Sequence, residues 1–317
     1  MTGELRIDVT EAALAHQPLV RGSHRLGATL RFLGRWWPVV VLVSIALTCM
    51  CAPVWGLENP LQQDLFHTLS GPSAQHWLGT DNLGRDMLSR LVYGGRASLL
   101  GALWATTLSV VIGLPLGVLA GYRGGFTDQC IMRVTDAVLA MPGIVFAVAL
   151  IGLLGPSLFH AMTTVGVYLA PVMIRIARAQ VLLVKQLDYV VITRSLRYGW
   201  WRIVWRHILP NIIDPIVVQA AIFMALDLLA EASLSFLGYG VVPPAPSWGS
   251  MLATAQTVMF QAGWEMLPPG IAILITAACF NLLGDKITRH WDRSARAPRR
   301  RRALLTVDAY TTSEEYE

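Results

Sequence analysis

Charged side chains are scarce in this 317-residue sequence. Asp, Glu, Lys and Arg make up 14% of it, whereas soluble globular domains carry about 25%. Hydrophobic residues make up 54%, and the mean hydropathy is +0.52. This balance excludes an ordinary soluble protein and predicts an integral membrane protein. The net charge of +5 is concentrated in a few stretches, which argues against the broad basic face that nucleic-acid binding requires.

Lysine is rarer still, since only Lys185 and Lys286 occur. Neither lies in a G-x-x-x-x-G-K-[ST] loop, so the sequence has no phosphate-binding loop of its own. We therefore expect no cofactor on this chain, and ATP and magnesium would have to be bound by a partner ATPase subunit. No H-E-x-x-H or G-x-S-x-G motif occurs, so we expect neither catalytic residues nor metal ligands.

Cysteine provides no framework either. There are four, Cys49, Cys51, Cys130 and Cys279, and three fall in apolar stretches where a thiol behaves as a small hydrophobic group. Their spacing predicts neither a disulfide pattern nor a zinc site. The polar start of the chain lacks the pattern of a removable signal peptide, so the first apolar stretch is expected to stay in the membrane.

Long apolar runs, uncharged except for Asp227 and Glu231, define the expected membrane spans. A helix needs about 20 apolar residues to cross the hydrocarbon layer, and the runs are 36–57, 97–122, 137–174, 215–236 and 266–284. The third run is too long for one crossing, and Gly155-Pro156 divides it into spans three and four. The sequence therefore predicts an all-α membrane protein with six transmembrane helices.

The distribution of basic residues orients these spans. Six spans place both termini on one side, and if that side is the cytoplasm, only Arg85, Arg90 and Arg96 of the 25 basic residues lie outside. The expected organisation is a cytoplasmic N-terminal segment (1–35), a six-span domain (36–285) and a cytoplasmic tail (286–317). The composition of the tail predicts disorder.

Two longer segments lie outside the expected spans. The outer segment 58–96 carries Asp81, Arg85, Asp86 and Arg90 among leucines, which predicts an amphipathic helix over 76–96 on the outer membrane surface. The prolines at 243, 244 and 246 predict a rigid turn into the stretch 251–263. These outer parts would either receive an external binding protein or brace the outer mouth. The inner segment 175–214 has room for one or two short helices.

The inner segment alternates arginines with tyrosines and tryptophans between Leu187 and Asn211, in "LDYVVITRSLRYGWWRIVWRHILPN". Pro210 ends this pattern just before the fifth span. Taken alone, the pattern is typical of an amphipathic helix that lies in the membrane interface.

Four motifs carry a family resemblance. "HWLGTDNLGRDMLSRLVYGGRASLLG" begins at residue 76, "RHILPN" at 206, "EASLSFLGYGVVPPAPSWGSML" at 231 and "FNLLGD" at 280. In this order the chain resembles the permease subunits of peptide and nickel ABC importers, and among them the C-type dipeptide permeases. The resemblance spans residues 36–293. It implies the transmembrane domain of a type I ABC importer in the bacterial cell membrane.

The resemblance also implies partners and a coupling role for the inner segment. The partners would be a second permease subunit, two ATPase subunits and an extracytoplasmic substrate-binding protein. A short cytoplasmic helix would dock in a groove of the ATPase and pass its movement to the spans. The implied coupling residues are Asp188, Tyr189, Arg194, Leu196, Arg197, Tyr198, Gly199, Trp201, Arg202, Arg206 and Pro210.

The coupling segment departs from the family pattern at three positions. Ile192 and Thr193 stand where small residues are usual, and Arg197 stands at the usual glycine, although Gly199 follows two positions later. Bulky residues in a close-packed groove would clash unless the partner's groove had changed with them. The alternatives are a modified ATPase groove, which we favour, and weak coupling.

Two acidic residues fall inside the fifth span. Asp227 and Glu231 are spaced i and i+4, so they share one helix face, and charges at membrane depth favour the interior of a bundle or a water-filled path. Glu231 belongs to a resembling motif and is also explained by pairing near the outer end of the span. Asp227 is the better candidate for lining a translocation path, but pairing with a threonine, or with an arginine of a neighbouring subunit, would explain it as well.

Proline and glycine within the spans predict kinked, closely packed helices. The prolines are Pro115, Pro142 and Pro171. Gly113 and Gly117 form a G-x-x-x-G pair suited to close helix packing, for which the partner permease is a candidate.

Three functional classes follow. The first is a non-enzymatic permease half for dipeptides or oligopeptides, with nickel or another small solute as the alternative substrate. The second is a secondary transporter that uses Asp227 and Glu231 as an ion relay, against which no inverted repeat is visible. The third is an intramembrane enzyme, which the scattered histidines and the missing motifs disfavour.

Overall fold

The computed structural model describes residues 24–196 and 198–288, with side chains from residue 36 onward. The predictions for the first 23 residues, for Arg197 and for the tail from residue 289 lie outside this part. Within it, the regular elements are helices, and one isolated β-bridge joins Thr80 and Asp86. The all-α prediction is confirmed for these residues.

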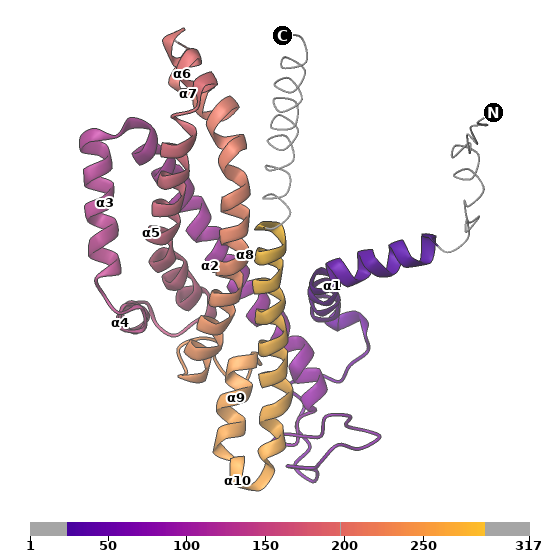
Figure 1. Cartoon of the computed structure of the whole chain (residues 1–317). Coiled ribbons are helices and arrows are strands. Elements are labelled where there is room, and N and C mark those ends of the chain that lie inside the picture. Colours follow the sequence, from indigo (N-terminus) through magenta and orange to yellow (C-terminus); the bar gives the residue numbers. More distant parts are fainter. Residues whose placement is uncertain (1–23, 197, 289–317) are drawn as a thin grey trace, which may run out of the picture.

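Three long helices form the centre of the molecule, with a fourth beside them (Figure 1). They are α2 (Met87–Arg123), α5 (Leu158–Val184), α8 (Leu209–Phe236) and the final helix, residues 267–288. The helix α1 (His24–Met50) flanks α2, and a short turn, η1 (Ala52–Val54), follows it.

The two ends of this bundle carry different short helices, which Figure 1 shows at its top and bottom. One end carries α6 (Asp188–Ser195) and α7 (Trp200–Ile203), and the π-helical turn η2 (Val204–Ile208) joins α7 to α8. The opposite end carries α9 (Trp248–Thr257), α10 (Met259–Ala262) and the turn η3 (Gly263–Met266). We refer to them as the α6–α7 end and the α9 end.

Four of the described helices are long and apolar enough to cross a membrane. They are Met87–Arg123, Leu158–Val184, Trp200–Phe236 and Met259–Thr288. A fifth crossing results if α3 (Gly125–Leu139) and α4 (Gly143–Leu154), which meet at 88°, form one broken span. The apolar part of the first predicted span is a shorter helix, Trp36–Met50.

The third span differs from the prediction. A break between α4 and α5 occurs at Gly155 as predicted, but a second break follows Leu139, and Pro142 directly precedes α4. The chain therefore does not cross as one helix over 137–154. Proline has no amide hydrogen and disfavours helical geometry in the residue before it, which explains a sharp turn at this position.

The predicted surface helix over 76–96 is also wrong. Residues 76–86 form turns, and helix α2 begins at Met87 and continues without interruption into the second span. Asp86 starts this helix because its side chain accepts a hydrogen bond of 2.7 Å from the Ser89 amide. Asp81, Arg85, Asp86 and Arg90 are buried, so they do not face water as an amphipathic helix would require.

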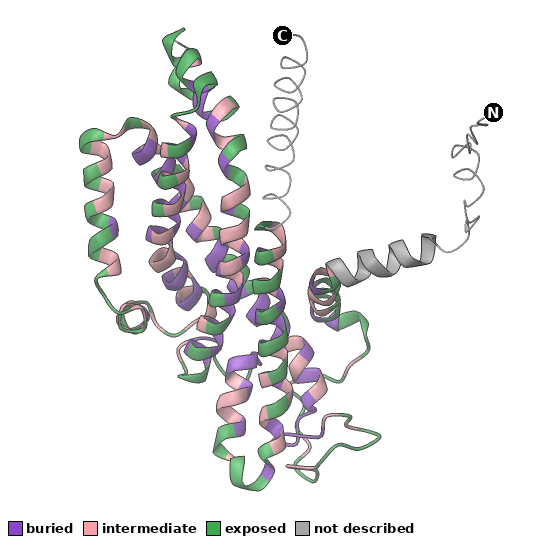
Figure 2. Cartoon of the chain, in the orientation of Figure 1, coloured by how far each residue is buried: buried purple, intermediate pink, exposed green. Residues whose placement is uncertain are grey.

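Glycine allows α2 and α5 to approach closely. A Cβ atom on Gly113 would lie 2.5 Å from Cβ of Met173, one on Gly117 would lie 2.6 Å from Cβ of Ala177, and Gly121 continues the series. The predicted G-x-x-x-G packing is therefore present, but within this chain rather than against a partner permease. Figure 2 shows buried residues concentrated along these central helices.

Candidate functional site

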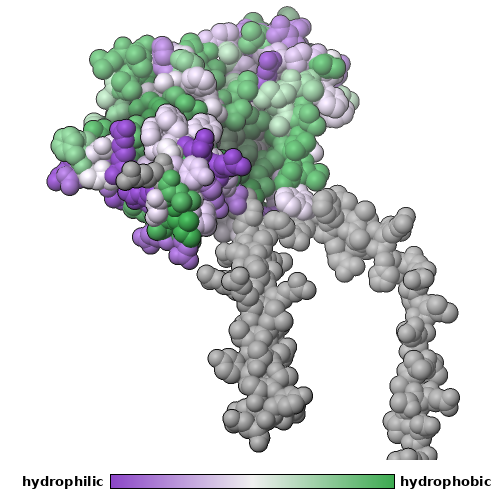
Figure 3. All heavy atoms as spheres, turned by 90° about the horizontal axis from the view of Figure 1, so that it is seen from above, coloured by the Kyte–Doolittle hydropathy of each residue, from purple (hydrophilic) through white to green (hydrophobic). Residues whose placement is uncertain are grey.

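The α6–α7 end has a buried apolar core and an exposed surface rich in aromatic and basic residues. Val190 of α6 and Ile203 of α7 are buried in one apolar cluster with residues of α2, α5 and α8. The short helices are thereby fixed to three long ones. Figure 3 looks onto this end and shows hydrophilic residues beside strongly hydrophobic ones.

The predicted coupling residues gather on this surface. All the described ones are exposed: Asp188, Tyr189, Arg194, Leu196, Tyr198, Gly199, Trp201, Arg202, Arg206 and Pro210. Aromatic residues that stay in water cost free energy unless something covers them, and tryptophan, tyrosine and arginine are the residues most enriched in interface hot spots. The geometry therefore fits a docking surface, and the coupling role of these residues stays a prediction.

Aromatic and cationic groups stiffen this surface. The rings of Trp200 and Trp201 stack with centroids 4.1 Å apart, and the Arg202 guanidinium lies 5.4 Å from the Tyr198 ring centroid. The Arg123 guanidinium at the end of α2 lies 5.7 Å from the Trp200 ring centroid. These contacts tie α7 to α2 and reduce the freedom of the tryptophans before any partner binds.

Lys185 links the same end to α2. Its Nζ donates a hydrogen bond of 2.8 Å to the Tyr122 carbonyl oxygen, which satisfies an acceptor in the last turn of α2. Burial, together with the nearby charge of Arg194, lowers the pKa of Lys185.

The atypical residues of the coupling segment point in different directions. Ile192 is 60% exposed and lies on the outside of α6, whereas the Thr193 hydroxyl bonds back to the Tyr189 carbonyl oxygen at 2.5 Å. The bulk of Ile192 therefore meets no obstacle among the residues that the structure describes. A clash of the Ile192 side chain would therefore be with a partner subunit.

The acidic pair of α8 lies inside the bundle. Asp227 is fully buried, and its Oδ2 accepts a hydrogen bond of 2.5 Å from the Thr106 hydroxyl of α2. Its Oδ1 has no hydrogen-bond partner among the described residues. Glu231 is also buried and accepts a hydrogen bond of 2.7 Å from Ser235 one turn further on. Both carboxyls thus pair with hydroxyls of their own chain, and a pathway role for Asp227 stays a prediction.

A buried ion cluster at the α9 end is the feature that sequence reasoning missed. The Asp81 carboxylate lies 2.7 Å from Nε of Arg85 and 3.4 Å from Nε of Arg90, and all three side chains are buried. Glu265 of η3 is buried nearby. The alternation of charges with leucines predicts an exposed polar surface. No feature of the sequence indicates that the 58–86 loop and α9 cover these charged residues.

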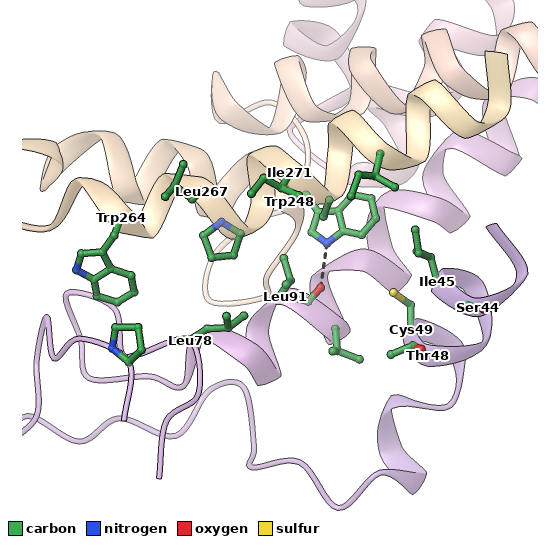
Figure 4. A pocket seen from close by; sticks show the side chains of 15 residues that line it. Ser44, Ile45, Thr48, Cys49, Leu78, Leu91, Trp248, Trp264, Leu267 and Ile271 are labelled. Atoms are coloured by element: carbon green, nitrogen blue, oxygen red, sulfur yellow. Dashed lines mark hydrogen bonds between the residues drawn. The ribbon is translucent and has the colours of Figure 1, made fainter. Parts of the chain in front are cut away.

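The α9 end is held together by Trp248. This residue is buried, and its indole donates a hydrogen bond of 2.9 Å to the Leu91 carbonyl oxygen of α2 (Figure 4). Ser247 and Ser250 form a capping box that starts α9 directly before this ring. The turn predicted at the prolines is present at residues 243–245, and the helix that follows it begins at Trp248, three residues before the predicted stretch 251–263.

An apolar cavity lies beside Trp248, and its lining is almost entirely hydrophobic. It has a volume of about 620 Å³ and lies between α1, the start of α2 and the final helix, as Figure 4 shows. Its wall includes Ile45, Cys49, Leu91, Trp264 and Ile271. In the described part of the chain, no group of three or more His, Cys, Asp or Glu residues could hold a metal ion.

Comparisons with known proteins agree with the resemblance of the motifs. Residues 113–297 match the family described as "binding-protein-dependent transport system inner membrane component". The chain is 38% identical over 247 residues to a glutathione transport system permease protein of Pectobacterium atrosepticum, which covers 78% of this chain and 81% of the relative. It is 36% identical over 247 residues to a dipeptide transport system permease protein of Alkalihalophilus pseudofirmus, with the same coverage of each chain.

A solved structure is similar in fold. A chain from inward-facing conformations of the MetNI methionine ABC transporter superposes with a TM-score of 0.55, at 21% identity, over 64% of this chain and 97% of that chain. At this identity the likeness concerns the fold alone.

Proposed function

Because this chain belongs to the family of binding-protein-dependent transport system inner membrane components, we propose that it forms half of the translocation path of an ATP-driven importer of dipeptides or oligopeptides. The family places it in the inner membrane as a multi-pass permease that is not itself an enzyme. The names of its relatives, which include dipeptide and glutathione permeases, support the peptide substrate.

The proposed assembly pairs this chain with a second permease subunit and two ATPase subunits, which would bind the ATP and magnesium. A binding protein would deliver the peptide at the α9 end. The observation that carries the proposal is the α6–α7 end, where a surface rich in exposed aromatic and basic residues rests on a buried core shared with α2, α5 and α8. A push on this surface would move those helices as one body.

The ATPase rate of the reconstituted transporter tests this function. We expect the peptide-loaded binding protein to stimulate hydrolysis, and we expect Tyr198→Ala and Trp201→Ala to remove most of the stimulation because both rings are exposed on the docking surface. Trp37→Ala is the matched control, since Trp37 is a similarly exposed aromatic residue of α1, remote from α6 and α7. Unchanged stimulation in the two coupling variants would contradict the assignment.

The proposed topology has six spans with cytoplasmic termini, and it can be tested with the native cysteines. Cys51 and Cys130 are exposed, whereas Cys49 and Cys279 are buried. In this topology an impermeant maleimide labels Cys51 from the outer side of sealed vesicles and Cys130 from the cytoplasmic side, and the variants Cys51→Ser and Cys130→Ser identify each signal. The opposite pattern would reverse the orientation.

A further inference from the structure

A polar cavity opens at the α9 end, apart from the apolar one. It has a volume of about 320 Å³ and lies between the loop before α2, the end of α8, the 238–245 turn and α9. The polar residues of its wall are Asn82, Arg85, Arg90, Ser235, Ser250, Thr254 and Thr257. No acidic side chain is among its lining residues.

Two buried arginines form the positive side of this wall. Only 6% of Arg85 and 4% of Arg90 is exposed. Asp81, the carboxylate that both contact, lies behind them and does not line the cavity. Glu265, which is also buried and interacts electrostatically with Arg85 and Asp81, does not line the cavity either, so the charged groups on its wall are the two guanidinium groups.

The guanidinium groups have donors to spare. Arg85 bonds Asp81 through Nε, and among the described residues neither of its terminal nitrogens makes a hydrogen bond. Arg90 donates from Nη1 to the Pro60 carbonyl oxygen at 3.2 Å and holds Asp81 through Nε. A guanidinium group has five N–H donors, and its planar fork matches a carboxylate in two parallel hydrogen bonds.

We propose that this cavity is a carboxylate site that takes the free C-terminal carboxylate of the transported peptide at the outer side of the permease. The inference rests on the proposed peptide-import function. A volume of about 320 Å³ lies at the small end of ligand pockets and suits the end of a peptide rather than a whole oligopeptide. Recognition of a group that every unmodified peptide shares allows different side chains to be accepted, and Phe236 and Val241 give the rest of the wall an apolar surface.

Binding to the assembled transporter without its binding protein tests the site directly. Thermal stabilisation of the complex is measured with a dipeptide and with the same dipeptide carrying a C-terminal amide. We expect the free acid to stabilise the complex and to bind about tenfold or more tightly than the amide, because only the free acid offers a charged carboxylate to the guanidinium donors.

Three variants assign the effect to the cavity. Arg85→Gln removes the guanidinium group, and Arg85→Lys replaces it with an ammonium group that keeps the charge and the pairing of Asp81. Ala253→Leu narrows the cavity without changing an ion pair. All three should weaken the stabilisation by the free acid, so the test survives if Arg85→Gln fails to fold. Arg96→Gln is the matched control, because Arg96 is an exposed arginine of α2 that does not line the cavity.

The outcomes separate the inference from the function. Equal stabilisation by acid and amide, or full stabilisation in Ala253→Leu, overturns the carboxylate site even when the wild-type ATPase responds to the peptide-loaded binding protein. A wild-type ATPase that ignores that protein overturns the proposed function instead. If the free dipeptide has no effect while Arg85→Gln weakens capture of the substrate-free binding protein, the arginines receive an acidic side chain of that protein, and the proposal is wrong.

Discussion

The glycine seam between α2 and α5 gives the sharpest stability prediction. A Cβ atom on Gly117 would lie 2.6 Å from Cβ of Ala177 and 2.6 Å from the Ile174 carbonyl oxygen. Ordinary carbon–carbon contacts are about 3.5–4.0 Å, so Gly117→Ala forces these helices apart by about 1 Å or displaces the backbone of α5. Both neighbours belong to the rigid part of a helix and cannot rotate away.

The expected cost of Gly117→Ala is about 1–3 kcal/mol, the range for overpacking a closely packed core. For a chain of 317 residues that corresponds to a fall in Tm of roughly 1–5 °C, measured by tryptophan fluorescence of the purified permease in detergent. Alanine has the higher intrinsic helix propensity by about 1 kcal/mol, so propensity alone predicts the opposite sign.

Gly152→Ala is the matched control for this measurement. Gly152 lies within α4, and a Cβ atom there would meet nothing within 4 Å. This variant should leave the Tm unchanged or raise it slightly. If Gly117→Ala behaves like Gly152→Ala, the close approach of α2 and α5 is not present in the protein, and the packing argument fails.

Other predictions concern the polar contacts. Arg178→Gln should lower the Tm more than Arg175→Gln. Arg178 makes two hydrogen bonds of 2.5 and 2.6 Å to the carboxylate of Asp128 in α3, whereas the ion pair of Arg175 is half exposed. Equal falls in Tm in low salt would contradict this ranking. Asp227→Asn should retain transport and most of the stability, since the amide oxygen still accepts a hydrogen bond from Thr106. Asp227→Leu leaves that hydroxyl unpaired and should cost about 1–3 kcal/mol of stability. If this chain alone carries out ion-driven transport and Asp227→Asn abolishes it, the result favours a secondary transporter. Lys185→Met should cost about 1 kcal/mol in thermal unfolding by releasing the Tyr122 carbonyl in the last turn of α2, and no loss of Tm would show that water satisfies this acceptor.

Hydropathy predicted those parts of the fold that depend on the membrane alone. The second, fourth, fifth and sixth predicted spans correspond to helices that can cross it, and the break at Gly155 was visible as a glycine followed by proline. Pro142 predicted a kink before α4, but the uniformly apolar run 137–154 gave no indication that α3 and α4 meet at 88°. Hydropathy registers the transfer of side chains into lipid and is insensitive to the direction of the backbone.

Tertiary contacts decided what the sequence alone could not. The spacing of Gly113 and Gly117 predicts close packing but not its partner, and Met173 and Ala177 of the same chain provide it. The pattern around Arg85 fits a surface helix equally well as long as the covering loop is unknown. Local periodicity predicts which side of a helix is polar, and only the fold decides whether that side meets water or another polar group.

The helix α8 connects the two candidate sites. At one end η2 joins it to α7, so that Trp200–Phe236 forms one membrane-spanning helix. At the other end Ser235 and Phe236 line the polar cavity. The bond between Thr106 and Asp227 fixes α8 to α2, whose first turn supplies Arg90 to the same cavity. A movement imposed at the α6–α7 end therefore reaches the cavity through α8 and α2, to which α9 is joined by the hydrogen bond from Trp248 to Leu91. On this basis we expect the affinity of the cavity for a carboxylate to differ between the nucleotide-bound and nucleotide-free states of the assembled transporter, because a change in the distance between α2 and α9 alters the width of the wall that holds it.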